Sequence, residues 1–195
     1  MTDLADRRGV ETEVYQPAED SQLLLEAARE YLSPGGTVLE VGTGSGYVAA
    51  ELQAGHDGRI VGSDLNPNAC LAARDRGVEV VQAILVEPFK PDVFDMVVFN
   101  PPYLPEHDAA ARDDWMEVAL TGGESGRAVI EPFLECVGRV LAPGGSVLLV
   151  ASSLSGLNEV EATATDAGFS ISEVARESFP FETLVVFEFR RDANG

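Results

Sequence analysis

Four consecutive residues, Asn100 to Tyr103 (Asn-Pro-Pro-Tyr), place an amide side chain and a stiff backbone directly after an apolar run, Val93 to Phe99, that is typical of a buried strand. The prolines fix the backbone and lack N–H groups, so their carbonyl groups and the amide oxygen of Asn100 are acceptors on a rigid loop. A loop of this kind can hold a planar NH2 group. The alternative is that the prolines only end the strand, which is ordinary turn chemistry.

A glycine-rich segment, Val38 to Gly46 (VLEVGTGSG), is typical of a buried strand that runs into a tight loop. Glycines let a ligand approach the backbone closely. The spacing departs from the dinucleotide pattern Gly-x-Gly-x-x-Gly, because the third glycine comes one residue early and Tyr47 takes a place that the pattern gives to glycine or alanine. Glu40 would repel a pyrophosphate but suits the cationic methionine end of S-adenosylmethionine. The segment therefore favours S-adenosylmethionine over NAD.

An acidic residue, Asp64, follows the next predicted strand, residues 60–63. The carboxyl ends of parallel strands share one edge of a sheet, so this carboxylate is expected beside the glycine-rich loop. Its two oxygens can accept hydrogen bonds from both hydroxyls of a ribose. The alternative is that Asp64 caps the helix expected to begin at Pro67.

The elements that must position these residues alternate along the chain. Hydrophobic periodicity and turn residues predict helices at 18–32, 47–54, 67–76, 127–141 and 155–167, and strands at 37–41, 60–63, 78–81, 94–99, 146–151, 169–176 and 183–189. The alternation predicts right-handed βαβ units in an α/β, doubly wound, mostly parallel sheet with helices on both faces. The last two strands have no helix between them, so we expect an antiparallel hairpin around Phe179-Pro180-Phe181.

Composition restricts the class of protein. The 195 residues suit a single domain, and residues 1–12 are expected to form a flexible tail. The sequence has neither an apolar run near the roughly 18 residues of a membrane span nor a secretory signal, which indicates a soluble, cytoplasmic protein. Cys70 and Cys136 are too far apart for a Cys-x-x-Cys half-site, and His56 and His107 stand apart from other ligand-type residues. We expect no metal.

The net charge of −20 arises from 33 acidic and 13 basic residues. The acids are scattered rather than gathered in one block, and Lys90 is the single lysine, which favours adaptation to high salt over a specific acidic interface. A duplex-binding protein needs a stripe of basic residues, and the sequence offers short pairs such as Arg7-Arg8 and Arg190-Arg191. Nucleic acid is the less favoured substrate class.

Together with Val14 to Ser21 (VYQPAEDS), these motifs resemble the HemK-type class I methyltransferases, especially the short archaeal and eukaryotic form that methylates glutamine in class I translation release factors. The resemblance implies a Rossmann-like sandwich with seven strands of which the last is antiparallel, S-adenosylmethionine as cofactor, and the glutamine of a Gly-Gly-Gln segment as target. It implies that the catalytic residues are Asn100, Pro101, Pro102 and Tyr103. It implies cofactor contacts at Tyr15, Pro17, Ser21, Glu40, Gly42, Thr43, Gly44, Gly46, Asp64, Leu65, Ile84, Leu85 and Asn100. The alternative for Tyr15 to Ser21 is a capped helix start.

The sequence departs from this family at Ile84, where an acidic residue usually meets the adenine of the cofactor. Ile84 cannot accept a hydrogen bond from the adenine amino group. Either a backbone group or Glu87 takes over this contact, or the affinity for the cofactor is lowered.

The resemblance also implies a partner, a small zinc-binding activator subunit that forms a heterodimer along the third strand, Val78 to Val81. The predicted topology places that strand at an edge of the sheet, where it can accept a further strand. The alternative is an ordinary short edge strand. Bacterial relatives carry an N-terminal helical domain that docks the release factor, so docking here is expected to need another element.

A glutamine amide nitrogen is a poor nucleophile and must be oriented. Hydrogen bonds from its two N–H groups to the Asn100 side-chain oxygen and the Pro101 carbonyl would fix it, with Tyr103 packed against the amide plane. No general base is needed before attack. The same loop can hold an adenine or cytosine amino group, so a DNA or RNA amino-methyltransferase is the enzyme alternative. A non-catalytic, cofactor-binding subunit of a methyltransferase complex is the other alternative, motivated by Ile84.

Overall fold

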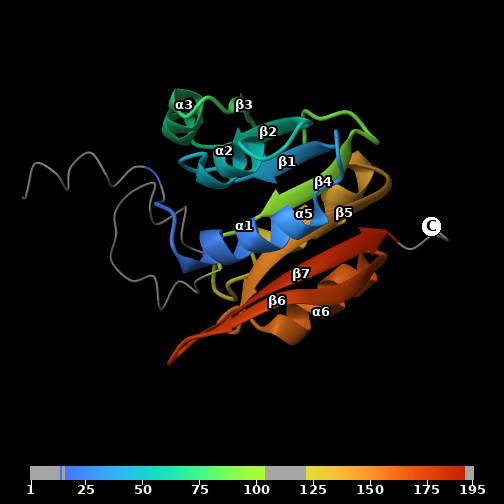
Figure 1. The fold of residues 1–195 in the computed structure, drawn as a ribbon. Helices are drawn as coiled ribbons and strands as arrows, with labels where there is room; N and C mark the ends of the chain where they lie inside the picture. The colour runs from blue at the N-terminus through green and yellow to red at the C-terminus, as the bar shows by residue number, and fades with distance from the viewer. Residues whose placement is uncertain (1–13, 15, 104–121, 192–195) are drawn as a thin grey trace, which may run out of the picture.

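A seven-stranded sheet forms the centre of the protein (Figure 1). The structure, a computed structural model, describes residues 14, 16–103 and 122–191. The sheet has the order β3-β2-β1-β4-β5-β7-β6. Its strands are β1 (Thr37–Val41), β2 (Arg59–Asp64), β3 (Glu79–Gln82), β4 (Phe94–Phe99), β5 (Leu141–Ser152), β6 (Phe169–Ser178) and β7 (Thr183–Arg191). Strands β1 to β5 are parallel, and β7 runs antiparallel to both of its neighbours. The predicted hairpin and the edge position of the third strand are thereby confirmed.

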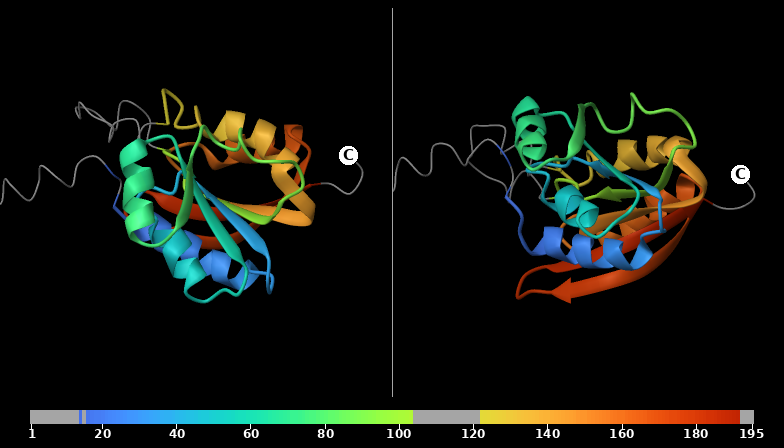
Figure 2. Two further views of the ribbon diagram at one scale, coloured as in Figure 1. Left: turned by 90° about the horizontal axis from the view of Figure 1, so that it is seen from above. Right: turned by 45° about the horizontal axis from the view of Figure 1, so that its top comes forward.

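Helices cover both faces of the sheet (Figure 2). One face packs against α1 (Glu19–Tyr31), α2 (Tyr47–Gln53) and α3 (Pro67–Asp75), and the other against α5 (Ile130–Val137), the 3-10 turn η1 (Gly138–Val140) and α6 (Leu157–Asp166). Successive strand residues point to opposite faces, so Val38 joins the core beneath α1 to α3 while Leu39 joins the core beneath α5 and α6. Burial on both faces explains the apolar runs of the central strands β4 and β5.

Two predicted boundaries are wrong. The helix expected at 127–141 begins only at Ile130, because Pro132 lacks an N–H group and is tolerated only in a first turn. The strand expected at 146–151 begins already at Leu141, so Pro143-Gly144-Gly145 lie inside β5. The pairing of β4 with β5 shifts register between Phe94 and Met96, so the turn residues form a bulge rather than a break.

Among the described helices, none is long and apolar enough to cross a membrane. The predicted tail, residues 1–12, and His107 lie outside the described residues. The side chain of His56 is buried, and its Nε2 lies 2.8 Å from the Gly36 carbonyl oxygen, so this histidine has a hydrogen-bond partner within the protein.

Candidate active site

The strand order reverses between β1 and β4, and such a switch point is where open α/β sheets bind ligands. In register, Val41 of β1 lies beside Ser63 of β2 and Phe99 of β4. The next residue of each strand is a predicted site residue: Gly42, Asp64 and Asn100. At about 4.8 Å between neighbouring strands, the three leave the sheet at one level within about 10 Å. The structure therefore brings together three motifs that are far apart in sequence.

Glu40 is buried beneath the glycine-rich loop and holds it in place. Its Oε2 accepts hydrogen bonds from the Thr43 hydroxyl at 2.5 Å and from the Ala49 N–H at 2.9 Å. Ala49 lies in the first turn of α2, where backbone N–H groups have no partner within the helix, so Glu40 caps α2 from the preceding strand. Burial raises the pKa of the Glu40 carboxyl to about 8, against the opposing effect of these two hydrogen bonds. A cation bound beside Glu40 would favour its ionised form.

Asp64 is half-buried and bonds to the loop as well as to its own turn. Its Oδ2 accepts from the Gly44 N–H at 2.9 Å, and its Oδ1 accepts from the Asn66 N–H at 2.8 Å. Burial raises the pKa of this carboxyl. The cap of α3 is Asn66, whose side chain accepts from the Asn68 N–H, so Asp64 is not that N-cap. Each Asp64 oxygen can accept more than one hydrogen bond, which leaves capacity for ribose hydroxyls.

Gly46 must be a glycine for two reasons. Its φ of +76° lies in the left-handed region, and a Cβ placed there would lie 2.7 Å from the Cα of Ala73 in α3. The glycine-rich loop is therefore packed directly between β1 and α3, and this contact fixes its position relative to Asp64.

Asn100 differs from these acidic residues because its acceptor has no partner. Its Oδ1 is buried and accepts no hydrogen bond within the part of the chain that the structure describes. A buried oxygen without a partner costs about 1–3 kcal/mol. An N–H donor placed by a ligand would recover this free energy. Pro101, which follows, is buried, and Pro102 and Tyr103 are half-buried.

Tyr103 connects the Asn-Pro-Pro-Tyr loop to the start of α1. Its hydroxyl donates to Asp20 Oδ2 at 3.0 Å, and its ring packs on the core beneath α1 to α3. Asp20 is buried, and its Oδ1 accepts from the Ser21 N–H at 2.6 Å and the Ser21 hydroxyl at 3.2 Å. The contact brings the start of α1 against residues 100–103, called the transfer loop below. The hydroxyl of Tyr103 is thus held by Asp20, and the packing of its ring against a substrate amide stays a prediction.

The predicted adenine side contains two half-exposed apolar side chains. Leu65 follows β2 and Ile84 follows β3. Leu85 has a φ of 49°, which is rare for a residue with a side chain, and it packs on the core beneath α5 and α6. Gln82, at the end of β3, donates from Nε2 to the Leu65 carbonyl oxygen at 3.1 Å, so a side-chain amide lies at this end of the sheet.

Two residues at the site were not singled out as important by the sequence. Asp20 lies in the first turn of α1, where an acidic residue is ordinary because it favours a helix start. Its partner Tyr103 is 83 residues away in the sequence. Arg127 donates to the carbonyl oxygens of Ser125 and Ser155, which ties the segment after residue 121 to the end of β5. No spacing in the sequence signals either contact. Tyr15 and residues 104–121 lie outside the described residues, and Pro17 is half-buried ahead of α1.

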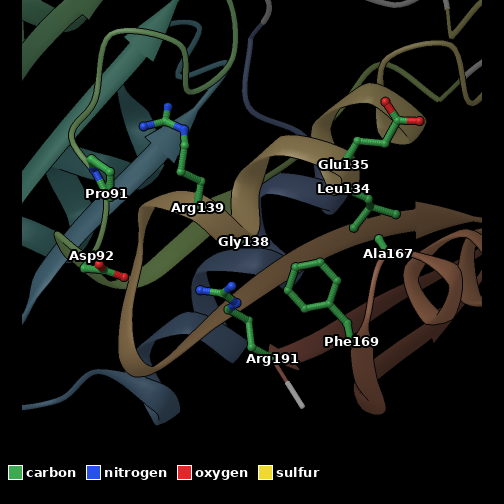
Figure 3. A pocket seen from close by; sticks show the side chains of 9 residues that line it. All are labelled: Pro91, Asp92, Leu134, Glu135, Gly138, Arg139, Ala167, Phe169 and Arg191. Atoms are coloured by element: carbon green, nitrogen blue, oxygen red, sulfur yellow. The ribbon is translucent and has the colours of Figure 1, made fainter. Parts of the chain in front are cut away.

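A pocket of about 400 Å³ lies elsewhere, and Figure 3 shows the side chains that line it. Asp92 precedes β4, Phe169 begins β6 and Arg191 ends the antiparallel β7, so this pocket is at the amino edge of the parallel strands. Its Arg139 donates to the carbonyl oxygens of Phe89 and Val86. The pocket contains none of the predicted site residues. Three or more His, Cys, Asp or Glu side chains arranged to hold a metal are not found in the described ranges.

Comparison with known proteins places the chain in a family. A family model described as "Methyltransferase domain" matches residues 38–123. A Methanocaldococcus jannaschii protein named "Putative protein N5-glutamine methyltransferase MJ0928" is 34% identical, over 89% of this chain and 90% of that protein. The human protein named "Methyltransferase HEMK2" is 33% identical, over 94% of this chain and 92% of its own length. The chain belongs to the HemK-type methyltransferases.

A solved structure supports the same assignment for this HemK-type chain. It is the E. cuniculi Mtq2-Trm112 complex, described as responsible for methylation of the eRF1 translation termination factor. The TM-score is 0.76 at 27% identity, over 92% of this chain and 99% of that chain. The class I methyltransferase fold predicted from the sequence is thereby confirmed, and this HemK-type protein is a methyltransferase.

Proposed function

We propose that this protein transfers a methyl group from S-adenosylmethionine to the side-chain amide nitrogen of a protein glutamine, the glutamine of the Gly-Gly-Gln segment of a class I translation release factor. The observation that carries the proposal is the buried, unpartnered Oδ1 of Asn100 at the switch point. That atom suits an N–H donor held in a fixed direction. The names of the M. jannaschii relative and of the E. cuniculi complex support glutamine and a release factor as target.

The cofactor would be held by the β1–β2 side of the site. Asp64 has acceptor capacity for the ribose, Glu40 offers a carboxylate to a cationic end, and the half-exposed Leu65 and Ile84 offer apolar surface to an adenine. S-adenosylmethionine supplies an electrophilic methyl group on a positively charged sulfur. Because the Gly44 N–H is already bonded to Asp64, the loop is ordered for this ligand in advance.

The transfer loop would orient the glutamine amide. One N–H of the amide donates to Asn100 Oδ1 and the other to the Pro101 carbonyl, which fixes the nitrogen and favours the positive charge that it acquires on forming a fourth bond. Tyr103, held by Asp20, sets the direction in which the loop leaves β4. The nitrogen loses its proton to water after transfer, so no side chain of the site has to act as a base.

The test is transfer of a labelled methyl group from S-adenosylmethionine to a release factor, with the Gln-substituted release factor as the matched control and mass mapping of the label. We expect label on the Gly-Gly-Gln glutamine alone. Label on adenine or cytosine of a nucleic acid instead would make the enzyme an amino-methyltransferase of DNA or RNA. Cofactor binding without transfer to any of these would indicate a non-catalytic subunit.

The same proposal includes a small zinc-binding activator subunit paired along β3. Support comes from the edge position of β3, from the exposed Leu71 in the neighbouring α3, and from the presence of Trm112 in the E. cuniculi complex. We expect Leu71→Asp to reduce co-purification of the activator. Val93→Asp, at the amino end of β4, should not reduce it. Equal co-purification with both variants would contradict this pairing.

We also propose a salt-rich cytoplasm as the working environment. A folded protein of 195 residues with a net charge of −20 is destabilised by repulsion between its acidic side chains, and salt screens this repulsion. We expect the melting temperature and the transfer rate to rise with KCl concentration. A protein whose melting temperature is independent of KCl would contradict this assignment.

A further inference from the structure

The tip of the β6–β7 hairpin presents an aromatic side chain to solvent. Phe181 is 93% exposed, more than any other large apolar side chain among the described residues. Full exposure of an aromatic ring forgoes the free energy that its burial would contribute. Position and surroundings of this residue distinguish it from an ordinary loose turn.

The tip is tied down by hydrogen bonds to the end of β5. The Phe179 N–H donates to the Glu182 carbonyl oxygen at 2.7 Å, and the Ser152 hydroxyl donates to Glu182 Oε1 at 2.6 Å. Ser153 and Thr183 exchange two hydrogen bonds, from the Ser153 N–H to the Thr183 carbonyl at 2.8 Å and from the Thr183 N–H to Ser153 Oγ at 3.0 Å. The ring is therefore presented from an ordered support, which lowers the entropy lost when a partner binds it.

The tip lies at the same end of the sheet as the transfer loop. Phe99 pairs with Leu149, so Asn100 lies at the level of Val150, which pairs with Val186 of β7. Phe181 is five residues further along, which is about 16 Å at ~3.3 Å per residue, and two strands to the side, which is about 10 Å. The separation from Asn100 is thus about 19 Å. Figure 1 shows the hairpin projecting beyond the carboxyl ends of β4 and β5.

A continuous surface joins the two places. Gly126 packs so closely against Tyr103 and Ser155 that a Cβ on it would lie 2.6 Å from the Tyr103 carbonyl oxygen and 3.0 Å from Ser155 Cβ. Ser155 donates back to the Ser152 carbonyl at 2.8 Å, and Ser152 holds Glu182. Leu154 lies on this path and is 38% exposed.

We propose that the β6–β7 tip, with Phe181 as its apolar anchor, is the surface on which the protein substrate docks, and that Leu154 extends this surface toward the transfer loop. This inference rests on the proposed function. A lone amide or nucleobase at Asn100 cannot reach a side chain about 19 Å away, whereas a folded protein whose glutamine enters the site is large enough to contact the tip as well. Glu177 and Glu182 flank the ring in the sequence. The docked surface is therefore an apolar recess bordered by basic side chains. The activator is assigned elsewhere, since β3 and β6 are opposite edges of the sheet.

The experiment compares an intact release factor with a short peptide from it. A peptide of about nine residues centred on the target glutamine extends about 14 Å to either side, too short to reach the tip. With Phe181→Ser we expect KM for the intact release factor to rise about tenfold, as on loss of an aromatic interface anchor, with kcat unchanged. Transfer to the peptide should be unaffected. Phe181→Leu should recover most of the lost affinity.

The matched control is Val93→Ser. Val93 is 37% exposed and immediately precedes β4, at the amino edge of the strands. The Val93→Ser variant should transfer methyl groups to the release factor and to the peptide as the wild type does. An unchanged KM in Phe181→Ser, or an equal loss with the peptide, would overturn the docking surface while leaving the proposed function intact. Self-association that Phe181→Ser abolishes would assign the tip to a second copy of this chain and also overturn it. No transfer by the wild-type enzyme to either substrate would overturn the proposed function itself, and the docking surface with it.

Discussion

The two halves of the candidate site use their hydrogen-bond acceptors in opposite ways. On the β1–β2 side, Glu40 and Asp64 together accept four hydrogen bonds, from Thr43, Ala49, Gly44 and Asn66. On the β4 side, Asn100 Oδ1 is equally removed from water and accepts none within the described part of the chain. The first half is complete without a ligand, and the second is not.

This difference separates stability from chemistry. Acceptors that hold the loop stabilise the fold whether or not a ligand is present, so their removal should affect both folding and binding. An acceptor buried without a partner opposes folding, and an incoming donor recovers that cost. Residues of the second half should therefore be dispensable for folding and necessary for transfer.

The largest effect is expected for Asn100→Ala. Removing an oxygen aimed at developing charge should lower methyl transfer about 100- to 1,000-fold. The melting temperature should stay equal or rise, because the substitution removes a buried unpartnered acceptor, and the affinity for S-adenosylmethionine should change little. Transfer kinetics, calorimetric binding and thermal unfolding on one preparation check all three. A parallel loss of transfer and cofactor affinity would erase the contrast between the halves.

Asp64→Ala should show the opposite pattern. Loss of hydrogen bonds to a charged group, each worth about 1.5–3 kcal/mol, should weaken cofactor binding on the order of 10- to 100-fold and lower the melting temperature. Asp75→Ala, an exposed carboxylate at the end of α3, serves as the control. The comparison fails if Asp64→Ala binds the cofactor normally while losing only transfer.

Glu40 adds a pH dependence to the first half. Burial raises the pKa of its carboxyl from 4.5 to about 8, so the folded protein retains a proton that the unfolded chain has lost. The contribution of the protonated Glu40 carboxyl to the free energy of unfolding is fully present below pH 4.5 and is lost as the pH rises toward 8. Relative to Glu40→Gln, the wild type should lose at least about 1 kcal/mol of unfolding free energy across this range, given about 1.4 kcal/mol per pKa unit.

Urea unfolding of both proteins at pH 5 and pH 8 measures this difference. Bound S-adenosylmethionine, which carries positive charge, should favour the ionised carboxylate and flatten the slope. If the difference between wild type and Glu40→Gln is the same at both pH values, Glu40 is not protonated in the folded protein.

The smallest effect is expected for Tyr103→Phe, which removes the hydrogen bond to Asp20 and leaves the ring in place. It should lower stability by about 1 kcal/mol and kcat several-fold, through the orientation of the loop. Tyr31→Phe, at the far end of α1, is the control. A loss of transfer as large as that of Asn100→Ala would move Tyr103 from positioning the loop to contacting the substrate.

The sequence predicted the order of helices and strands better than it predicted the contacts between distant residues. Alternating apolar runs and turn residues placed all seven strands, because periodicity records which faces are buried. It misplaced the start of β5, where Pro143 to Gly145 have the composition of a turn yet form a bulge in the pairing with β4. The local composition of a bulge and of a turn is the same, and only the neighbouring strand distinguishes them.

At the candidate site, the sequence found the motifs but not their couplings. The bond between Tyr103 and Asp20, and the approach of Gly126 to Tyr103, join segments that are distant in the chain or carry no motif. The unpartnered state of Asn100 Oδ1 is a property of its surroundings and has no signature in residue type. The roles of the individual residues in binding and transfer stay predictions.

The packing of α1 has a consequence for how the protein is made. This helix is synthesised before β5, β6 and β7, yet it packs against all three strands as well as against α2. Asp20 at the start of this helix accepts the hydrogen bond from Tyr103, so the position of α1 bears on the loop after β4. A nascent chain that ends before the β6–β7 hairpin carries the motifs of the site but lacks part of the surface on which α1 packs. We therefore expect full methyl transfer only after the hairpin has joined the sheet.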